Sequence, residues 1–399
     1  MAQILMLTPQ LPYPPRQGTA LRNWGILRGL AEAHRISLLS FAAADQQLIP
    51  AQELTERVER IAVVPQPDRS LGRRLRDVAL SREPDLALRL ASPAFAAQVE
   101  AWCEATQFDQ LLVEGLELAP FIKNALSRQP ALRVIFDAHN CEYLLQKRAA
   151  QADSRQPRRW LGALYSAVQW RRLYKLEQRI CRESDLVIAV SEADASALRV
   201  LAPGLQPLLL PNGIDVSAYA AFAEAQDLRQ PALVFTGSMS FRPNVDGVLW
   251  FTQQVLPAIR QAVPEAVFYI VGRNPHPRLD AIRELPGVII TGSVPDSRPY
   301  IRAAQVYVVP LLVGGGTRLK ILEATAMGKA IVSTTLGAEG FTALEGAMCL
   351  TDTAAEFATA CIRLLHDADM RATLGDRAHR FAEAYDWKTL LPPLLERLG

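Results

Sequence analysis

The sequence predicts an α/β protein with two successive, doubly wound domains, and three observations support this. Short β-branched runs alternate with longer amphipathic segments along all 399 residues, as in βαβ units with parallel sheets. The runs form two series, and a chain of this length is long enough for two domains with separate cores. Proline and glycine cluster between the two series, in Pro203–Pro231, as expected for a domain boundary.

The first series of predicted strands is Ile4–Leu7, Ile36–Phe41, Ile61–Val64, Leu111–Val113, Val134–Phe136, Leu186–Val190 and Leu208–Leu210. The second is Leu233–Thr236, Val267–Val271, Val288–Thr291, Val306–Val309 and Ile331–Ser333. We place the domains at residues 1–205 and 206–380, and expect a C-terminal helix in 381–399 to pack back on the first domain. Ligands of such sheets bind beyond the carboxyl ends of the strands, so the loops there are the places to look for function.

Composition excludes several classes of protein. Half of the residues are hydrophobic and about a fifth are charged, and the net charge is +2, which describes a globular protein and not a basic nucleic-acid coat. The five scattered cysteines contain no Cys-x-x-Cys pair, which argues against a disulfide framework or a zinc site and favours a reducing compartment. No apolar run reaches the ~18 residues of a spanning helix and no charged leader precedes the first strand, so we expect a cytoplasmic protein.

The most informative segment is residues 313–324, which read Val-Gly-Gly-Gly-Thr-Arg-Leu-Lys-Ile-Leu-Glu-Ala and follow a predicted strand. A strand, a glycine loop and a helix together present backbone N–H groups and a positive helix end to an anion. Lys320 and Glu323 lie three residues apart and project from one side of that helix. A cation for phosphate beside a carboxylate for hydroxyls suits a nucleotide-sugar. A glycine-rich turn followed by a surface Lys–Glu pair is the alternative interpretation.

Two loops of the first half also follow predicted strands. Residues 8–22 form a proline-stiffened loop with Gly18 near its end, where a phosphate or sugar could approach the backbone; an ordinary βα loop would look the same. His139 comes shortly after a strand that ends in Asp137. An isolated histidine is more often structural, but this position at a strand end favours function.

In the second half, Gly237 and the residues up to Asn244 follow the first strand of the series. The small side chains allow close approach, Arg242 could reach an anion, and Asn244 could cap the next helix. Gly272 and Gly292 follow the next two strands, so small residues gather at one edge of the predicted sheet.

In this order, these segments resemble a retaining glycosyltransferase of family 4, in the branch with a Gly-Gly-Gly-Thr-Arg-Leu-Lys loop. The family's architecture is GT-B, in which two doubly wound Rossmann-like domains face each other across a cleft. The resemblance covers nearly the whole chain and is strongest from Leu233 to Phe341. In the first half it rests on Pro14–Gly18, Asp137–Asn140, Ala189–Glu192 and Pro211–Asp215.

The resemblance implies a role for each matched residue. Lys320 resembles the lysine that holds the donor diphosphate, Glu323 the glutamate that binds the ribose hydroxyls, and His139 the residue beside the sugar and acceptor. Catalytic roles follow for Lys320, His139 and Arg242, and donor binding for Gly18, Gly237, Gly315, Gly316, Thr317, Arg318 and Glu323. The family usually has a further glutamate where this chain has Gly315, so backbone N–H groups would meet the sugar hydroxyls here.

The implied reaction moves a sugar from a nucleoside-diphosphate sugar to a glycan or polyprenyl-linked acceptor, in surface polysaccharide or glycoconjugate synthesis. The helix end with Lys320, Arg242 and Arg318 would stabilise the charge of the leaving diphosphate. The one Asp-x-Asp triplet of the sequence, Asp367–Asp369, lies between predicted C-terminal helices. We therefore expect no metal, and no cofactor besides the donor substrate.

Lys147–Arg182 is strongly basic, with ten Lys and Arg against Asp153 and Glu177, and with Trp and Tyr residues interleaved. Such a helix suits an anionic membrane surface, here the inner face, although a solvated helix with aromatics packed inward has the same composition. No recognition motif accompanies the basic residues, so we expect no nucleic-acid partner.

Two other classes share the architecture. A non-hydrolysing nucleotide-sugar epimerase would need acid and base carboxylates in the cleft. A non-catalytic partner subunit would bind the nucleotide-sugar without turnover.

Overall fold

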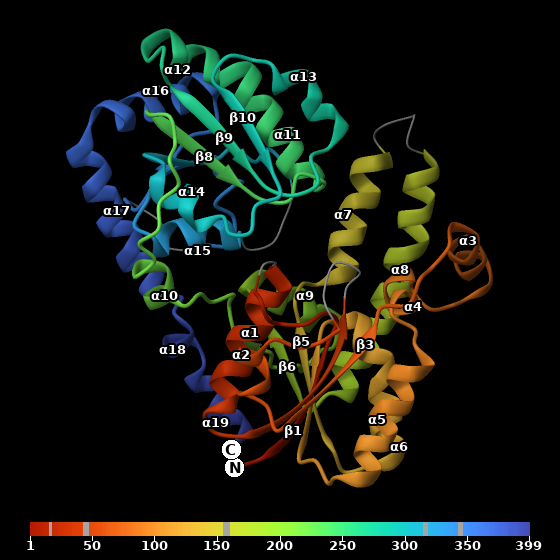
Figure 1. Cartoon of the computed structure of the whole chain (residues 1–399). Coiled ribbons are helices and arrows are strands. Elements are labelled where there is room, and N and C mark those ends of the chain that lie inside the picture. The colour runs from red at the N-terminus through yellow and green to blue at the C-terminus, as the bar shows by residue number, and fades with distance from the viewer. Residues whose placement is uncertain (16–17, 43–47, 155–159, 314–317, 342–345) are drawn as a thin grey trace. The chain divides into compact units, whose positions relative to one another are not determined.

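The computed structural model describes residues 1–15, 18–42, 48–154, 160–313, 318–341 and 346–399. The chain divides into two compact units, residues 1–211 with 390–399, and residues 212–389. Figure 1 shows both, and each is described by itself.

Among the described residues, the first unit holds a parallel sheet of seven strands in the order β3-β2-β1-β4-β5-β6-β7. The strands are β1 Gln3–Thr8, β2 Arg35–Ala42, β3 Arg60–Pro65, β4 Gln110–Glu114, β5 Arg133–Ala138, β6 Leu186–Ala189 and β7 Leu208–Leu209. The helices are α1 Gly18–Ala31, α2 Gln52–Thr55, α3 Leu71–Leu80, α4 Asp85–Arg89, α5 Pro93–Ala105, the 3₁₀ turn η1 Leu116–Phe121, α6 Ile122–Arg128, α7 Glu142–Ser154, α8 Trp160–Glu183, α9 Glu192–Leu201 and α19 Pro392–Leu398.

The described part of the second unit holds a parallel sheet of six strands in the order β10-β9-β8-β11-β12-β13. The strands are β8 Ala232–Thr236, β9 Val267–Val271, β10 Val288–Gly292, β11 Val306–Val309, β12 Ala330–Ser333 and β13 Cys349–Leu350. The helices are α10 Val216–Ala220, α11 Arg242–Trp250, the π turn η3 Phe251–Val255, α12 Leu256–Ala262, η4 Pro277–Leu279, α13 Asp280–Arg283, α14 Arg298–Ala303, α15 Leu319–Ala326, α16 Ala354–His366 and α17 Ala368–Glu383. The short helix α18, Trp387–Leu390, spans the point where the chain returns from the second unit to the first.

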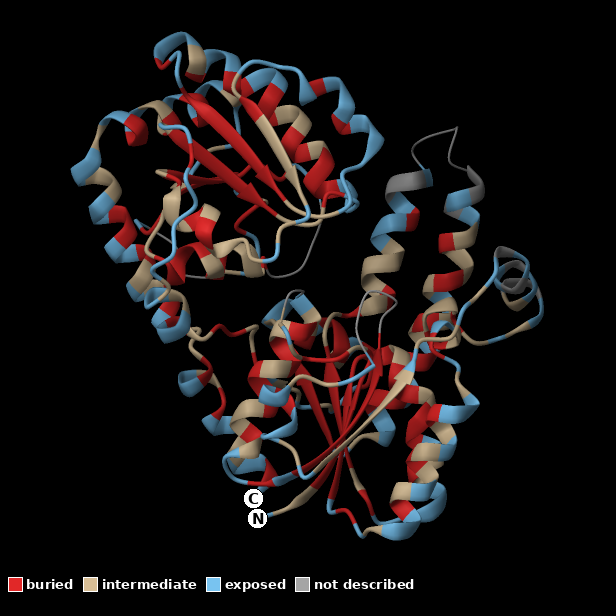
Figure 2. Ribbon diagram, viewed as in Figure 1, coloured by how far each residue is buried: buried red, intermediate tan, exposed pale blue. Residues whose placement is uncertain are grey.

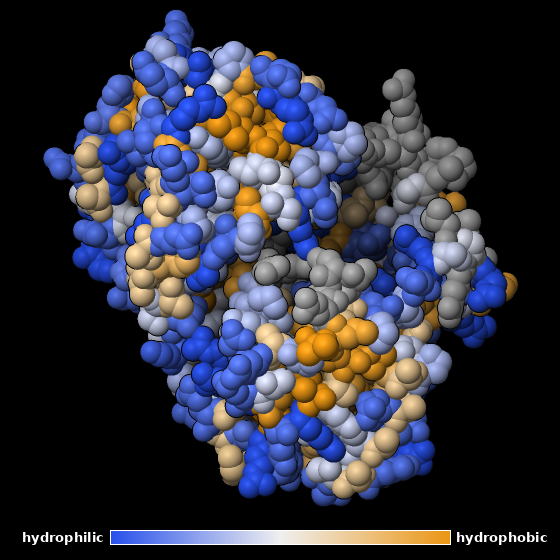
Figure 3. Space-filling model, viewed as in Figure 1, coloured by the Kyte–Doolittle hydropathy of each residue, from blue (hydrophilic) through white to orange (hydrophobic). Residues whose placement is uncertain are grey.

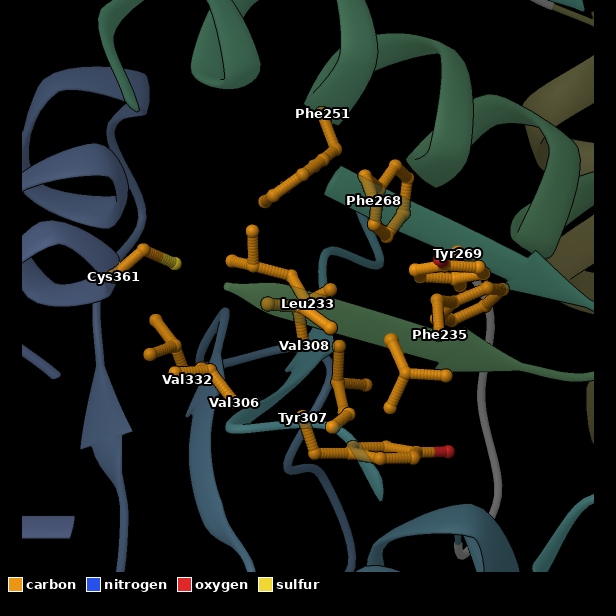
Figure 4. Close-up of a cluster of buried hydrophobic side chains, with 14 of the residues drawn as sticks. Leu233, Phe235, Phe251, Phe268, Tyr269, Val306, Tyr307, Val308, Val332 and Cys361 are labelled. Carbon is orange, nitrogen blue, oxygen red and sulfur yellow. The ribbon is translucent and has the colours of Figure 1, made fainter. Parts of the chain in front are cut away.

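Each sheet is the centre of its unit's core. Figure 2 shows the central strands buried and the edge strands β3 and β10 mostly half-buried, with helices that are buried on one side and exposed on the other. In the second unit, Leu233, Phe251 and Phe268 are fully buried and pack with Tyr307 around the sheet (Figure 4). Parallel strands covered on both faces need continuous apolar runs, and this is why the β-branched runs of the sequence form the strands.

Every predicted strand is present, and the two doubly wound sheets confirm the predicted fold class of each half. The sequence missed β13, because this edge strand of two residues pairs at only Val332–Cys349 and Ser333–Leu350 and has no apolar run of its own. Side-chain caps begin several helices as their sequence suggests: Asp367 Oδ1 accepts a hydrogen bond from the Met370 N–H at 2.7 Å. The first carboxylate of the Asp-x-Asp triplet therefore serves as a helix cap.

The first unit runs six residues beyond the predicted boundary at 205, because β7 pairs with β6 and keeps the chain in the sheet. Residues 381–389 lie in the second unit, where Ala382 packs with Ile214 and Leu322. Only the last ten residues return to the first unit, and there the Gln110 side-chain amide donates to the Leu398 carbonyl at 2.7 Å.

The helices α7 and α8 lie side by side in the first unit (Figure 1). Buried Glu177 of α8 accepts hydrogen bonds from the backbone N–H groups of Glu142 and Tyr143, at 2.8 and 2.7 Å, and so satisfies the start of α7. Burial raises the pKa of Glu177 to about 8.

None of the helices within the described ranges is long and apolar enough to cross a membrane. The face of the molecule in Figure 3 is mostly hydrophilic, with apolar residues gathered in a few patches on each unit.

Candidate functional site

In the second unit, Lys320 lies at the edge of the sheet where strands β8 and β11 end. It is the second residue of α15, and its Nζ donates to Asn244 Oδ1 at 2.9 Å and lies 4.0 Å above the centre of the Phe235 ring. Burial lowers the pKa of Lys320 to about 7, with the charge of Arg318 acting in the same direction and Glu323 opposing it. The lysine is therefore held against an amide and an aromatic face, with no carboxylate bound to its Nζ in the described part of the unit.

Two glycines let the backbone come close to this lysine. A Cβ at Gly237 would lie 2.8 Å from Asn244 Nδ2 and 2.9 Å from Lys320 Nζ. A Cβ at Gly272 would overlap the carbonyl oxygen of Gly237, so the turns after β8 and β9 are in direct backbone contact. The predicted small-residue edge is thus a close-packed surface beside the Lys320 amine.

Glu323 lies one turn further along α15. Its Oε1 accepts a hydrogen bond from the Tyr219 hydroxyl at 3.0 Å. Burial raises the pKa of Glu323, partly opposed by that hydrogen bond and by Lys320. Burial also raises the pKa of Tyr219 well above its usual range, so the phenol stays a donor that fixes the carboxylate.

The other predicted residues of this unit are placed as follows. Arg242 opens α11 with its side chain 54% exposed, and its Nε donates to Asp246 Oδ2 at 3.3 Å; the described contacts of Lys320 do not include it. Arg318 is buried directly before α15, and burial lowers its pKa. The predicted donor-binding residues Gly315, Gly316 and Thr317 lie outside the described residues.

In the first unit, charged residues gather where β4 and β5 end. The last residue of β4, Glu114, is in register with Asp137 of β5, and both are fully buried. His139 follows β5, and its Nε2 lies 2.9 Å from Glu114 Oε2 and 3.7 Å from Asp137 Oδ2. The His139 side chain is 14% exposed, so it is the member of this group that a ligand can reach.

Arg22 of α1 neutralises this edge. Its Nε and Nη2 donate to the two oxygens of Asp137, each at 2.7 Å, and its Nη1 donates to the Leu210 carbonyl at 2.9 Å. Burial alone would raise the pKa of Asp137, but the Arg22 charge and hydrogen bonds hold it below its ordinary value. The pair joins α1, β5 and the end of the first unit through a buried, bidentate contact.

His139 and Glu114 shift each other's pKa. Burial raises the pKa of Glu114 to about 7, and the charge of Asp137 acts in the same direction while His139 opposes it. Burial by itself lowers the pKa of His139, but the hydrogen bond to Glu114 and the charges of both carboxylates outweigh it and raise the pKa.

Glu114, Asp137 and His139 are close enough to be considered as metal ligands, since one ligand atom from each lies within 4.8 Å of the others. However, both Asp137 oxygens are bonded to the Arg22 guanidinium, which brings a positive charge to the place that a cation would take. The donor set therefore fits an internal ion-pair network better than a metal site.

Gly18 is the exposed first residue of α1, at the helix end where an anion would be favoured. Sequence reasoning missed Glu114, Arg22 and Tyr219. Glu114 and Arg22 did carry a signal: the first directly follows the predicted strand Leu111–Val113, and the second closes the loop in which Gly18 was singled out. The contact of Tyr219 with Glu323 spans 104 residues and has no local signal. The roles of the predicted site residues stay predictions.

Two doubly wound parallel sheets, one in each unit, are the ingredients of the GT-B class, and comparison with known proteins agrees. Residues 17–213 match the family model described as a glycosyl transferase 4-like domain, and residues 230–367 match that of glycosyl transferases group 1. These matches and the fold place the chain among the GT-B glycosyltransferases.

A phosphatidyl-myo-inositol mannosyltransferase of Mycolicibacterium smegmatis is 28% identical over 215 residues, which are 51% of this chain and 54% of that protein. The chain therefore matches about half the length of this relative. The sucrose-phosphate synthase of Thermosynechococcus elongatus has a similar structure, with a TM-score of 0.71, 17% identity and 99% of both chains covered. Anabaena Alr3699/HepE, solved with UDP-glucose, has a TM-score of 0.64 at 17% identity, covering 100% of this chain and 99% of that one. The two structures share the fold.

We predict that Arg22→Ala destabilises the first unit by ~3–5 kcal/mol, because it leaves Asp137 buried without its counter-charge. Urea unfolding followed by far-UV circular dichroism measures the loss. Arg128→Ala is the control, since Arg128 forms a solvent-exposed pair with Glu100 at 2.7 Å and its removal should hardly move the midpoint. Equal midpoints for both variants would contradict a structural role for the buried pair.

Proposed function

We propose that this protein is a retaining glycosyltransferase that moves a sugar from a nucleoside-diphosphate sugar to a glycan or lipid-linked acceptor, in surface polysaccharide or glycoconjugate synthesis. The observation that carries the proposal is the amine of Lys320, held by Asn244 beside Gly237, where a Cβ would meet both side chains. A cation at a glycine-lined sheet edge suits a diphosphate. The UDP-glucose complex of the structurally similar Anabaena protein supports a donor of this kind.

The proposed mechanism is electrostatic. As the bond from the sugar to the diphosphate breaks, negative charge grows on the leaving oxygens, and a fixed cation stabilises it without reorganisation. The low pKa of Lys320, about 7, implies that a bound diphosphate also stabilises the protonated amine. We assign Glu323, fixed by Tyr219, to the ribose hydroxyls, and His139 to the sugar and acceptor side.

Lys320→Ala should lower sugar transfer, or slow donor hydrolysis, by at least ~100-fold, the scale of losing one preorganised charge stabiliser. Release of the nucleoside diphosphate from a panel of nucleotide-sugars provides the measurement. Lys329→Ala is a matched control, because Lys329 follows the same helix and donates to the Arg302 carbonyl at 2.9 Å, away from the proposed site. Activity of Lys320→Ala within a few-fold of the Lys329 variant would place the diphosphate elsewhere.

We propose that catalysis needs no metal, because Lys320 and the start of α15 supply the positive charge that Mg²⁺ or Mn²⁺ would otherwise provide. Turnover should therefore persist after dialysis against EDTA. Loss of activity on chelation that returns when metal is added would refute this. A protein that binds nucleotide-sugars but never turns them over would instead fit a partner subunit, and one that returns an epimerised sugar would fit an epimerase.

We also propose that α7 and α8 attach the protein to the inner face of an anionic membrane. Their exposed basic residues are Arg148, Arg171, Lys175, Arg179 and Arg182. Trp170 of α8 is half-buried, with Lys147 Nζ 5.4 Å and Arg171 Cζ 4.7 Å from its ring centre. We therefore expect charge, and not insertion of Trp170, to supply the attraction.

Phosphatidylglycerol vesicles should sediment the protein at low salt and release it as salt rises, since ~1 kcal/mol per basic residue decays within a Debye length. The double variant Lys175→Glu/Arg179→Glu should bind much less. Lys123→Glu/Arg128→Glu changes the same charge on exposed α6 positions and should bind as the wild type does. Equal loss in both double variants would show that net charge, not this surface, binds the vesicles.

A further inference from the structure

The buried carboxylate of Glu114 is hydrogen-bonded to the ring of His139. It is fully buried at the end of β4, and its Oε2 lies 2.9 Å from His139 Nε2. The Asn23 amide, turned so that its nitrogen faces acceptors, donates to the same oxygen at 2.9 Å and to the Thr19 carbonyl at 3.1 Å. The other oxygen, Oε1, is buried and has no hydrogen-bond partner among the described residues. Burying a carboxylate with one oxygen unpartnered costs free energy of folding.

Asp137, the other carboxylate beside His139, does not form a hydrogen bond with the imidazole. Both oxygens of Asp137 are bonded to Arg22 at 2.7 Å, and the nearer one lies 3.7 Å from His139 Nε2, which is beyond hydrogen-bond range. Glu114 is therefore the direct partner of the ring, and Asp137 acts on it only through charge.

The other ring nitrogen of His139 is left for a ligand. Nδ1 makes no hydrogen bond within the described ranges, and it lies on the side of Gly115, where an added Cβ would stand 3.6 Å away. The φ of Gly115 is +96°, a conformation that a residue with a side chain rarely adopts. The same added Cβ would lie 2.9 Å from Glu117 Oε2, so a glycine at this position lets the His139 ring and the Glu117 carboxylate both lie close to the backbone.

We propose that Glu114 is a positioning residue, which binds Nε2–H of His139 and so makes Nδ1 the ring atom that meets an oxygen of the sugar or acceptor. The inference rests on the proposed transferase function and names a residue through which His139 works. A carboxylate on one nitrogen fixes the tautomer and orientation of an imidazole. It also favours the imidazolium, in which Nδ1–H donates to the substrate.

The charged groups that face the imidazole come from several elements of the first unit: Arg22 of α1, Glu114 of β4, Asp137 of β5, Glu117 of η1 near Gly115 and Glu142 of α7. Replacing Glu114 by Gln keeps the shape and removes one of the two carboxylates that raise the pKa of the ring. The protonated ring is present at low pH and is lost as pH rises through its pKa. The variant should therefore lose it at lower pH, by about one unit.

The ring itself provides the first readout. In ¹⁵N spectra of the full chain, the five histidines can be separated by comparison with His139→Gln. We expect His139 to be the Nε2–H tautomer when neutral, and its pKa to fall in Glu114→Gln. Glu117→Gln, which removes a nearby carboxylate that does not bond the ring, is the matched control and should shift it far less. Because the tautomer of His139 is measured in the wild type, this part of the test still holds if Glu114→Gln folds poorly.

Turnover provides the second readout. Glu114→Gln should lower kcat ~10-fold or more, with the donor KM within a few-fold. This is less than the ~10²–10⁴-fold of a group that itself transfers the proton, because Glu114 acts through His139. The alkaline limb of the pH profile should move to lower pH. In the His139→Ala background the Glu114 change should have no further effect, as in a double-mutant cycle for residues that act through each other.

An Nδ1–H tautomer in the wild type, an unmoved ring pKa in Glu114→Gln, or effects that simply add in the double variant would each overturn the inference. If the spectra behave as expected and yet the wild type turns over no nucleotide-sugar, the proposed function fails while the pairing of Glu114 with His139 stands. The two failures are thereby distinguishable.

Discussion

The carboxyl ends of neighbouring parallel strands meet at one edge of a sheet, and both groups of candidate residues depend on this constraint. Glu114, the last residue of β4, is in register with Asp137, the next-to-last residue of β5, 23 residues away in the chain. Phe235, Gly237 and Gly272 lie at or just after the ends of β8 and β9. No local segment could assemble either group, because each group draws its members from more than one strand or helix. The order of the strands in each sheet thus decides which candidate side chains lie close together.

Both units bury charged side chains, but the partners of these side chains differ between the units. The first unit pairs its charges, with Arg22 bidentate on Asp137 and His139 on Glu114. The second unit leaves the Lys320 amine on a neutral amide and an aromatic ring, and its pKa falls accordingly. A buried charge with its partner in place avoids the cost of an uncompensated charge, whereas a buried cation without a bonded carboxylate is ready for an anionic ligand. This difference is why we assign the diphosphate to the second unit.

Candidate residues with strong local signals could be singled out from the sequence alone, and their roles stay predictions. A glycine run before a helix with a lysine in its first turn pointed to Lys320, and a strand-ending aspartate pointed to His139. Arg242 shows the limit of this reasoning: its place in the loop suggested an anion contact, but the structure pairs it with Asp246 one turn along the same helix. A side chain that long has several acceptors within reach, and the sequence does not rank them.

The sequence by itself determined the class of fold, the order of the strands along the chain and the loops that hold the candidate residues. These follow from periodicity and from glycine and proline placement, which are local properties. Only the tertiary structure decided which side chains meet: Arg22 with Asp137 across 115 residues, Lys320 with Asn244 across 76, and Tyr219 with Glu323 across 104. Such contacts depend on how strands are ordered in the sheet and how helices pack on it, and neither is encoded in any short stretch of the chain.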